Sequence, residues 1–555
     1  MLRSHRSRSA ALALAVALAL VAAGCSSDDA KGSDGSPTTA ASGKVDTSNE
    51  FTGKGPKGSG PAPASVTVAM RLDVDSFDPH TSLGDSGAQQ AFLFLYDAMV
   101  HRSLDGKILP GVASKWEVTP TKGVFTIRDG LTCSDGTPLD AMAVAASYEA
   151  LGNDPGSLGK SKIFGPDGME SVTADPAAKT VTIETKSPNN DMLTGLATTG
   201  FIVCPSGLAN PTALKETPQG SGPYELANAK RGDEYTLRLR EDYKAWPDET
   251  TAADLPKTVT LKVISDDATA ADLLESGKVQ IAGILSTDAK RLQADSKLVS
   301  VPAQGYGSNA ILFMQKPSAP TSDVKLRQGM AMLLDSVQGG AAETQGLGTP
   351  RRTLFTPNID CYTPDAEAYA PKYSPEAAAA FLDEAGYKKG ADGKRTKPDG
   401  SKLTIKVVGN NMQGQIPQFI ADSLEAGGFD VNLFVGTYNE SIAKLLSDQF
   451  DMGSYPFTDS SPLPSLWPNQ IGTGAGANFG QVNNTEFDDL VKEALAVDPA
   501  ADPGARCQKW QQAERSVLEA ANVVPMDQPT NYWFGNGVTF NSQYFKIDPF
   551  SIRSK

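Results

Sequence analysis

Short runs rich in β-branched residues recur along the chain, and segments with helical spacing of apolar residues lie between some of them. Alternation of apolar and polar positions over about four to eight residues predicts a β-strand. The predicted strands are Val66–Met70, Val124–Arg128, Thr180–Glu184, Tyr235–Leu239, Val259–Ile264, Leu403–Val408 and Val431–Val435. The predicted helices, each with a Pro or Gly signal at one end, are Leu139–Leu151, Pro375–Ala385 and Ile416–Ala426. Helices and strands alternate in the last third of the chain, which predicts a mixed α/β layer architecture.

The N-terminus has a different pattern, with three arginines followed by an apolar run over residues 10–23. Basic residues, a short apolar core and small residues together are typical of a secretory signal peptide, here residues 1–24. The sequence Ala22-Ala23-Gly24-Cys25 resembles a bacterial lipobox, so we expect lipidation at Cys25. The alternative is an ordinary secretory signal with an incidental cysteine. No later segment reaches the apolar length of a membrane-spanning helix.

Residues from Ser26 to about Ser65 are mostly Ser, Gly, Asp, Lys, Thr, Pro and Ala. Such a segment buries too little apolar surface to offset the entropy that it would lose on ordering. We therefore predict a disordered, lipid-anchored tether over residues 25–65. The folded body then begins near Val66 and lies outside the cell, at the outer face of the cytoplasmic membrane.

Composition and charge exclude several classes of function. The 555 residues carry a formal net charge of -15, which argues against a nucleic-acid partner because phosphate binding needs a concentrated basic surface. The sequence has only three histidines and no Cys/His cluster with metal-ligand spacing, so we expect no metal and no cofactor. The catalytic motifs G-x-S-x-G and H-E-x-x-H are absent. We therefore expect that the protein is not an enzyme, with an exported hydrolase as a remote alternative.

Four cysteines remain in the predicted folded body: Cys133, Cys204, Cys361 and Cys507. An exported compartment permits disulfide bonds, and the number of cysteines is even. The sequence alone allows three pairings, and buried free thiols are the alternative.

A set of short motifs runs through the predicted body. They are Ser76–His80, Tyr96–Val100, Phe125–Gly130, Ser134–Leu139, Gly220–Tyr224, Asp323–Gln328, Pro375–Gly386 and Phe450-Asp451. In this order the set resembles the extracytoplasmic solute-binding proteins of peptide-type ABC importers, family 5, which includes oligopeptide, dipeptide and nickel binders. The motifs cover nearly all of residues 66–540, and the ordered set is more specific than any one motif.

The resemblance implies an α/β, two-lobed periplasmic-binding-protein-like fold (type II, class C), with an inserted subdomain in lobe one and two hinge crossovers. Lobe one would comprise residues 66–92, 211–320 and 526–555, the inserted subdomain residues 93–210, and lobe two residues 321–525. The hinges would then lie near Leu312–Ser318 and Pro525–Tyr532. With these boundaries the inserted subdomain and lobe two hold two cysteines each, so we favour the disulfides Cys133–Cys204 and Cys361–Cys507.

The expected ligand site is a cleft between the lobes, which hinge motion would close. A peptide ligand requires a carboxylate for its ammonium group, and the resemblance implies Asp459 for this role. The other candidate ligand-binding residues are Leu83, Gly84, Asp85, Tyr306, Tyr455, Trp467 and Asn478. Each candidate has a structural alternative, because turns favour Asp, Gly and Asn and because aromatic side chains are common in cores.

The resemblance further implies a monomeric lipoprotein that captures small peptides and delivers them to separate ABC permease and ATPase subunits. Tyr455 stands where many family members have Trp before the binding loop, so a non-peptide solute remains an alternative ligand. A ligand sensor with the same fold is a second alternative, since a fold does not fix a function.

Overall fold

The computed structural model describes residues 53–58, 60–82, 87–157, 159–411, 413–459, 462–475, 477–497, 502–543 and 546–555. The expected signal peptide, Cys25 and most of the expected tether lie outside the described residues. The candidate contacts Leu83, Gly84 and Asp85 also lie outside them. Within the described part of the chain, no helix combines the length and apolar character that crossing a membrane requires.

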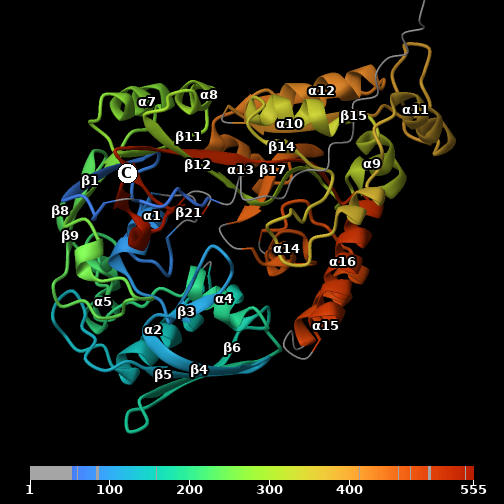
Figure 1. Ribbon diagram of the computed structural model, residues 1–555. Helices are drawn as coiled ribbons and strands as arrows, with labels where there is room; N and C mark the ends of the chain where they lie inside the picture. Colours follow the sequence, from blue (N-terminus) through green and yellow to red (C-terminus); the bar gives the residue numbers. More distant parts are fainter. Residues whose placement is uncertain are drawn as a thin grey trace, which may run out of the picture. The chain divides into compact units, whose positions relative to one another are not determined.

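The first large sheet has seven strands in the order β12-β19-β11-β1-β10-β9-β8 (Figure 1). Its strands are β1 (Ser65–Met70), β8 (Tyr224–Lys230), β9 (Glu234–Leu239), β10 (Thr258–Val263), β11 (Ile281–Ile284), β12 (Leu298–Gln304) and β19 (Thr530–Asn536). β1 runs parallel to β10 and β11, whereas the other pairings are antiparallel. Helix α1 (Ala88–Leu95) packs into the apolar core on one face, and α7 (Asp267–Glu275) and α8 (Asp288–Gln293) pack into that on the other.

A smaller antiparallel sheet lies in the segment where an inserted subdomain was expected. Its order is β4-β5-β7-β6, with β4 (Ala113–Thr119), β5 (Lys122–Ile127), β6 (Met169–Asp175) and β7 (Thr180–Thr185). The other elements of this segment are β2 (Val100–Arg102), β3 (Ile108–Pro110), α2 (Ala141–Asn153), α3 (Lys160–Phe164), α4 (Met192–Thr198), α5 (Pro205–Ala209) and α6 (Pro211–Leu214). Apolar side chains of α2 and α4 share one core with this sheet, so the segment has its own hydrophobic centre.

The second large sheet has six strands in the order β14-β18-β13-β17-β15-β16. They are β13 (Tyr306–Phe313), β14 (Thr349–Pro350), β15 (Thr404–Asn410), β16 (Asp430–Gly436), β17 (Met452–Asp459) and β18 (Val523–Gln528). One face packs on α9 (Val324–Ala331), α11 (Pro375–Glu384) and α12 (Ile416–Ala426), and the other on α14 (Trp467–Ile471), α15 (Thr485–Ala496) and α16 (Pro503–Glu519). Two further helices, α10 (Ser336–Thr344) and α13 (Tyr438–Leu446), complete this part of the fold (Figure 1).

Short elements close the chain around these sheets. They are the strands β20 (Val538–Thr539), β21 (Ser542–Gln543), β22 (Lys546–Ile547) and β23 (Arg553–Ser554), and the 3-10 turns Ala252–Asp254, Pro320–Ser322, Pro364–Ala368, Pro464–Leu466 and Pro549–Ser551. All seven predicted strands and all three predicted helices are present, with ends shifted by two residues or fewer. Helix α2 begins at Ala141 rather than Leu139 because the Asp140 side chain accepts a hydrogen bond from the Ala143 N–H and caps the helix.

The chain passes between the two large sheets at single residues. Gly305 alone separates β12 from β13, and Pro529 alone separates β18 from β19. The second crossover lies within the predicted Pro525–Tyr532, but the first lies before the predicted Leu312–Ser318. Strand β13 is buried at every residue after Tyr306 and is flanked by β17 and β18, so its sequence pattern does not reveal to which sheet it belongs. Sheet membership therefore changes at residue 305 rather than at the expected boundary after residue 320.

The end of the expected tether packs against the first sheet. Gly53 donates from its N–H to the Pro302 carbonyl and accepts from the Ser542 N–H, at 3.0 and 2.7 Å. A Cβ at Gly53 would lie 1.8 Å from the Ser542 carbonyl oxygen, so only glycine permits this approach. The Thr539 hydroxyl donates to the Pro56 carbonyl at 2.6 Å. The expected disorder through residue 65 is thus wrong for residues 53–58 and 60–65, because backbone hydrogen bonds replace the apolar burial that this segment lacks.

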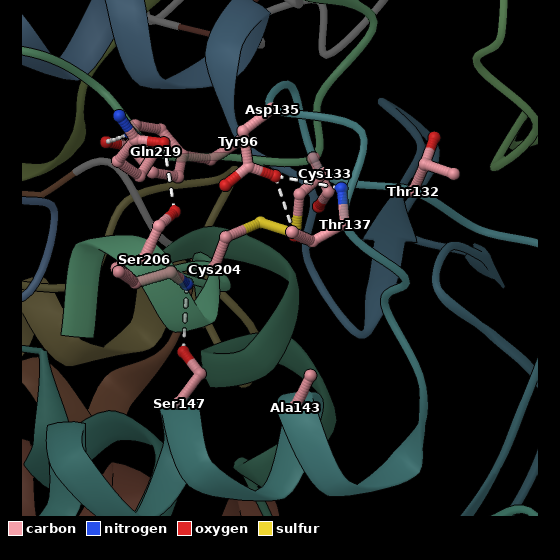
Figure 2. The surroundings of a disulfide bond; sticks show 12 residues. Tyr96, Thr132, Cys133, Asp135, Thr137, Ala143, Ser147, Cys204, Ser206 and Gln219 are labelled. Atoms are coloured by element: carbon pink, nitrogen blue, oxygen red, sulfur yellow. Dashed lines mark hydrogen bonds between the residues drawn. A yellow bond between two sulfur atoms is a disulfide. The ribbon is translucent and has the colours of Figure 1, made fainter. Parts of the chain in front are cut away.

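Two disulfide bonds join the pairs that the sequence analysis favoured, Cys133–Cys204 and Cys361–Cys507. Figure 2 shows the first bond between the turn at Asp135 and the start of α5. Asp135 accepts hydrogen bonds from the Thr137 N–H and hydroxyl at 2.9 and 2.6 Å, which fixes the turn in the Ser134–Leu139 motif. This motif is therefore structural, and the disulfide attaches it to the rest of the subdomain.

Candidate functional site

The second sheet presents Tyr306 and Asp459 side by side at the point where the chain crosses between sheets. Tyr306 begins β13 directly after Gly305, Asp459 ends β17, and the two residues pair in the antiparallel ladder. Two of the predicted ligand contacts therefore have neighbouring backbone positions at the end of the sheet nearest the first crossover.

An aromatic cluster lies farther along strand β17. Tyr455, two residues before Phe457 on β17, makes edge-to-face contacts with Phe457 and Phe479 at ring-centroid distances of 5.4 and 5.3 Å. Trp467 stacks on Phe355 at 6.1 Å and is fully buried. Tyr455 remains partly exposed at the edge of this cluster, whereas Trp467 belongs to the core beneath it.

The geometry around Asn478 gives it a structural role. Its side-chain amide donates to the carbonyls of Gly472 and Val482 at 2.9 and 2.8 Å, and its side-chain oxygen accepts from the Val482 N–H at 2.9 Å. These three hydrogen bonds connect residues within the loop that follows α14. We therefore do not retain Asn478 or the buried Trp467 among the proposed ligand contacts.

A loop that the sequence reasoning overlooked carries Asp360 to the same end of the sheet. The Asp360 N–H donates to the Pro462 carbonyl at 3.0 Å, which fastens this loop to the segment that follows Asp459. Upstream, the Phe355 N–H donates at 2.8 Å to the carboxyl of Glu514 on α16. Downstream, Cys361 is disulfide-bonded to Cys507, also on α16. Asp360 is thus held on both sides although its own side chain is exposed.

A guanidinium group from the inserted subdomain faces these residues. Arg102 ends β2, and its charge acts on both Tyr306 and Asp360. Burial raises the pKa of Tyr306, and the nearby Arg102 guanidinium opposes that rise. Desolvation also raises the pKa of Asp360, whereas the positive charges of Arg102 and Arg506 oppose it. Desolvation and the nearby positive charges thus act on the pKa of Asp360 in opposite directions.

Among the described residues, neither Arg102 nor Asp360 forms an ion pair within 4.0 Å. The Arg102 guanidinium, supplied by the subdomain, and the Asp360 carboxylate, supplied by the second lobe, both act electrostatically on Tyr306, and the Arg102 charge also acts on Asp360. This arrangement provides donors and acceptors for a charged solute, and the part of the chain that the structure describes holds no group of three or more His, Cys, Asp or Glu that fits a metal ion.

A buried polar network connects the two crossovers. The Gln528 amide donates to the Gly305 carbonyl and to Asn358 Oδ1, both at 2.9 Å. Arg351 donates to the Gln528 side-chain oxygen at 3.0 Å. The Asn358 amide also donates to the Gly305 carbonyl, at 3.2 Å. Gln528 is fully buried. The network joins the two single-residue crossovers to each other and, through Asn358, to the loop that carries Asp360.

Beside the second crossover lies a pair of buried acids, Glu343 on α10 and Asp527 on β18. The Ser454 hydroxyl donates to Glu343 Oε1 at 2.8 Å, and the Asn309 amide donates to Asp527 Oδ1 at 3.2 Å. Burial, followed by the negative charge of Asp527, raises the pKa of Glu343 well above its ordinary value, so this residue holds a proton. The pair faces away from the aromatic cluster, because Ser454, which donates to Glu343, and Tyr455 project to opposite faces of β17.

The sequence reasoning missed four charged residues of this region: Arg102, Asp191, Asp360 and Arg506. One signal was available, since Asp360 and Arg506 immediately precede Cys361 and Cys507. A disulfide between those cysteines places both charges at one point of the second lobe. For Arg102 and Asp191 the sequence offers no comparable signal, because their position depends on how the subdomain meets the second lobe.

Comparison with known proteins agrees with this architecture. Residues 107–479, more than half of the chain, match the family of bacterial extracellular solute-binding proteins, family 5 Middle. Protein XP55 of Streptomyces lividans is 25% identical over 472 residues, covering 82% of this chain and 81% of that protein. The probable D,D-dipeptide-binding periplasmic protein DdpA of Escherichia coli (strain K12) is 24% identical over 529 residues, covering 88% and 94%.

A solved structure extends the likeness to three dimensions. A substrate binding protein from Microbacterium hydrocarbonoxydans, complexed with 4-hydroxybenzoate hydrazide, superposes with a TM-score of 0.73 at 25% identity and covers 89% of this chain and 100% of that chain. Together with the family match, the likeness identifies the two sheets as the lobes of a periplasmic-binding-protein fold. The chain therefore belongs to family 5 of the bacterial extracellular solute-binding proteins, as the solute-binding component of an ABC transporter and not as an enzyme.

Proposed function

We propose that this protein captures short peptides between its lobes and presents them to an ABC permease. The observation that carries the proposal is that Arg102 of the subdomain and Asp360 of the second lobe, neither of which forms an ion pair with another described residue, both act on Tyr306, whose partner in the strand ladder is Asp459. A peptide carries an ammonium group, a carboxylate and a regular array of backbone donors and acceptors between them. A site that offers one guanidinium and two candidate carboxylates matches those two charged ends.

In this proposal Asp459 receives the ligand ammonium group, and Arg102 binds the ligand carboxylate. Asp360 and the Tyr306 hydroxyl border the same space and complete the polar contacts. The exposed edge of Tyr455 contacts the first side chain of the ligand. Leu83, Gly84 and Asp85 remain proposed contacts on the first lobe. Closure occurs by rotation at Gly305 and Pro529, where a single residue links each pair of strands.

Export and attachment complete the proposal. Residues 1–24 direct secretion, Cys25 is lipidated, and a short tether holds the body at the outer face of the cytoplasmic membrane as a monomer. The tether is shorter than its composition suggests, because residues 53–58 pack on the first lobe. Permease and ATPase subunits are separate chains.

Native mass spectrometry of the full chain, purified from detergent-solubilised membranes without unfolding, tests the ligand class directly. A series of peptide masses released from the protein is the expected result. A single non-peptide mass would overturn the peptide proposal while leaving the family assignment intact. That second outcome has a specific precedent in the structural relative complexed with 4-hydroxybenzoate hydrazide.

A further inference from the structure

An ion pair joins the inserted subdomain to the second lobe at a point remote in sequence from both crossovers. Arg506 Nη2 on α16 lies 2.6 Å from Asp191 Oδ1, which precedes α4, and the two side chains are only 9% and 2% exposed. Beside it, the Asn190 amide donates to the Leu495 carbonyl at 2.8 Å and also to the Val497 carbonyl. These bonds join helices whose apolar side chains belong to different hydrophobic cores.

The subdomain side of this contact is rigid. The Asn189 amide donates to the carbonyls of Lys162 and Ile163 at 3.2 and 2.9 Å, and Asn189 Oδ1 accepts from the Asp191 N–H at 3.1 Å. Asp191 occupies the N-cap position of α4, yet its side chain makes no capping hydrogen bond to that helix. An N-cap aspartate ordinarily satisfies its own helix, so this carboxylate is directed instead to Arg506.

The side on the second lobe is equally fixed. Arg506 lies in the first turn of α16, which the Asp502 side chain caps by accepting from the Ala505 N–H at 2.9 Å. The next residue, Cys507, is bonded to Cys361. Two preorganised groups thus meet across the lobes with little freedom to adjust.

The pair is not fully satisfied by the described residues. Asp191 Oδ2 and Arg506 Nε are buried and have no hydrogen-bond partner among the residues that the structure describes. Burying two charges costs desolvation energy that their attraction only roughly offsets, whereas losing one partner leaves a lone buried charge. The intact ion pair therefore permits contact between the lobes but contributes little net free energy to it. When one partner is neutralised, the remaining buried charge makes that contact unfavourable.

We propose that Asp191 and Arg506, assisted by Asn190, form a latch that is made only when the inserted subdomain and the second lobe close on each other, and that this latch sets the ratio of closed to open protein. The inference rests on the proposed function, because a closing equilibrium matters for a protein that captures a ligand between lobes. Asp191 and Arg506 act as positioning residues and need not touch the ligand. A ligand supplies the remaining free energy of closure through its own contacts.

Distance measurements between spin labels on the two sides test the latch without any ligand being known. The labels are attached through a keto-bearing amino acid at the exposed positions Lys115 and Gln508 of the full chain, which leaves all cysteines untouched. The wild-type chain should show a short-distance population. Asp191→Asn should lower its ratio to the long-distance population at least tenfold, and the exchanged pair D191R/R506D should restore part of it. Asn190→Ala should also lower the ratio of the short-distance to the long-distance population, but by a smaller factor.

Glu493→Gln is the matched control, because it removes an ion pair with Lys509 that lies wholly within the second lobe at 2.6 Å. It should leave the distance distribution unchanged. A wild-type chain without a short-distance population, or Asp191→Asn with the wild-type ratio, would overturn the latch. Trialanine, added as a probe in the same experiment, separates the two proposals. If Asp191→Asn changes the measured distances but trialanine does not, the result supports the latch and argues against peptides as the ligand class.

Discussion

Tyr306 and Asp459 stand directly opposite each other in the ladder between β13 and β17, at the strand ends nearest the first crossover. The pairing brings a residue that follows Gly305 next to one that opens the expected binding loop. The Asp360 N–H is bonded to the Pro462 carbonyl, in the segment that follows Asp459, and the Asp360 charge acts on Tyr306. The proposed ligand site thus draws on three separate stretches of the second lobe, and the subdomain adds Arg102.

Replacing Asp459 by Asn should weaken the binding of a peptide with a free N-terminus tenfold or more, equivalent to about 1.4 kcal/mol. The reason is the loss of a charge-assisted hydrogen bond to the ligand ammonium group. Titration calorimetry with a peptide recovered from the native protein measures the change. N-acetylation of that peptide should weaken binding to the wild type but not to Asp459→Asn. If N-acetylation lowers the affinity of both proteins equally, Asp459 does not bind the ammonium group. Asp430→Asn, in the same sheet, serves as control.

Replacing Arg102 by Gln should abolish the preference for a free ligand carboxylate. Hydrogen bonds to a charged group contribute about 1.5–3 kcal/mol, so amidation of the peptide C-terminus should cost the wild type roughly tenfold to a hundredfold in affinity. The variant should bind the free and amidated peptides equally. Arg238→Gln is a suitable control, because Arg238 pairs with Glu225 on the exposed side of the first sheet. A variant that still discriminates between the two peptides would contradict the assignment.

Glu514 gives the stability of the protein a defined pH dependence. Burial raises its pKa to about 8, and its carboxyl accepts the Phe355 N–H. In the unfolded chain this group loses its proton near pH 4.5, its ordinary pKa, whereas in the folded protein it stays protonated to about pH 8. The folded state therefore binds more protons in that window, and the free energy of unfolding should fall as pH rises from about 4.5 to 8, by a few kcal/mol at most.

Urea unfolding at several pH values measures this slope in the wild type and in Glu514→Gln. The amide of Gln keeps an acceptor for the Phe355 N–H but carries no titratable proton, so the slope should be smaller in the variant. Identical slopes would show that Glu514 does not hold a proton in the folded protein. Glu519→Gln is the control, since Glu519 lies on the same helix and is exposed to solvent.

The two disulfides should differ in their effect on ligand binding. Peptide mapping without reduction should recover Cys133–Cys204 and Cys361–Cys507. Paired replacement by Ser at either bond should lower the free energy of unfolding by about 2–4 kcal/mol. Only C361S/C507S should also weaken ligand binding, because that bond holds Asp360 and Arg506 in place. Equal binding by the two double variants would show that this disulfide does not organise the site.

Cys25→Ser should move the protein from the membrane fraction to the soluble extracellular or periplasmic fraction, because a lipid-bearing cysteine is the proposed anchor. Immunoblotting of separated fractions is sufficient to detect the change. Retention of the variant in the membrane fraction would contradict lipidation at this residue.

Local patterns in the sequence account for much of the secondary structure. The strands from Val66 and from Thr180, and the helix from Ile416, appear where alternation, apolar spacing and glycine signals predicted them. The same patterns did not locate the first crossover. Strand β13 is buried from both sides, so its sequence does not distinguish membership of the first sheet from membership of the second. They also misassigned residues 53–58, whose ordering comes from hydrogen bonds to distant backbone groups such as that of Ser542.

Strand periodicity and helix end signals predicted the α/β layers from local sequence, and the resemblance implied the two lobes and the favoured cysteine pairs. The folded structure was needed to show that the charge of Arg102 acts on Asp360 and that Asp191 pairs with Arg506. The residues of each pair are hundreds of positions apart in the sequence, and their proximity depends on how the subdomain and the second lobe come together. No local periodicity encodes that placement, because charged side chains at isolated surface positions look alike in sequence until packing brings them to the same point.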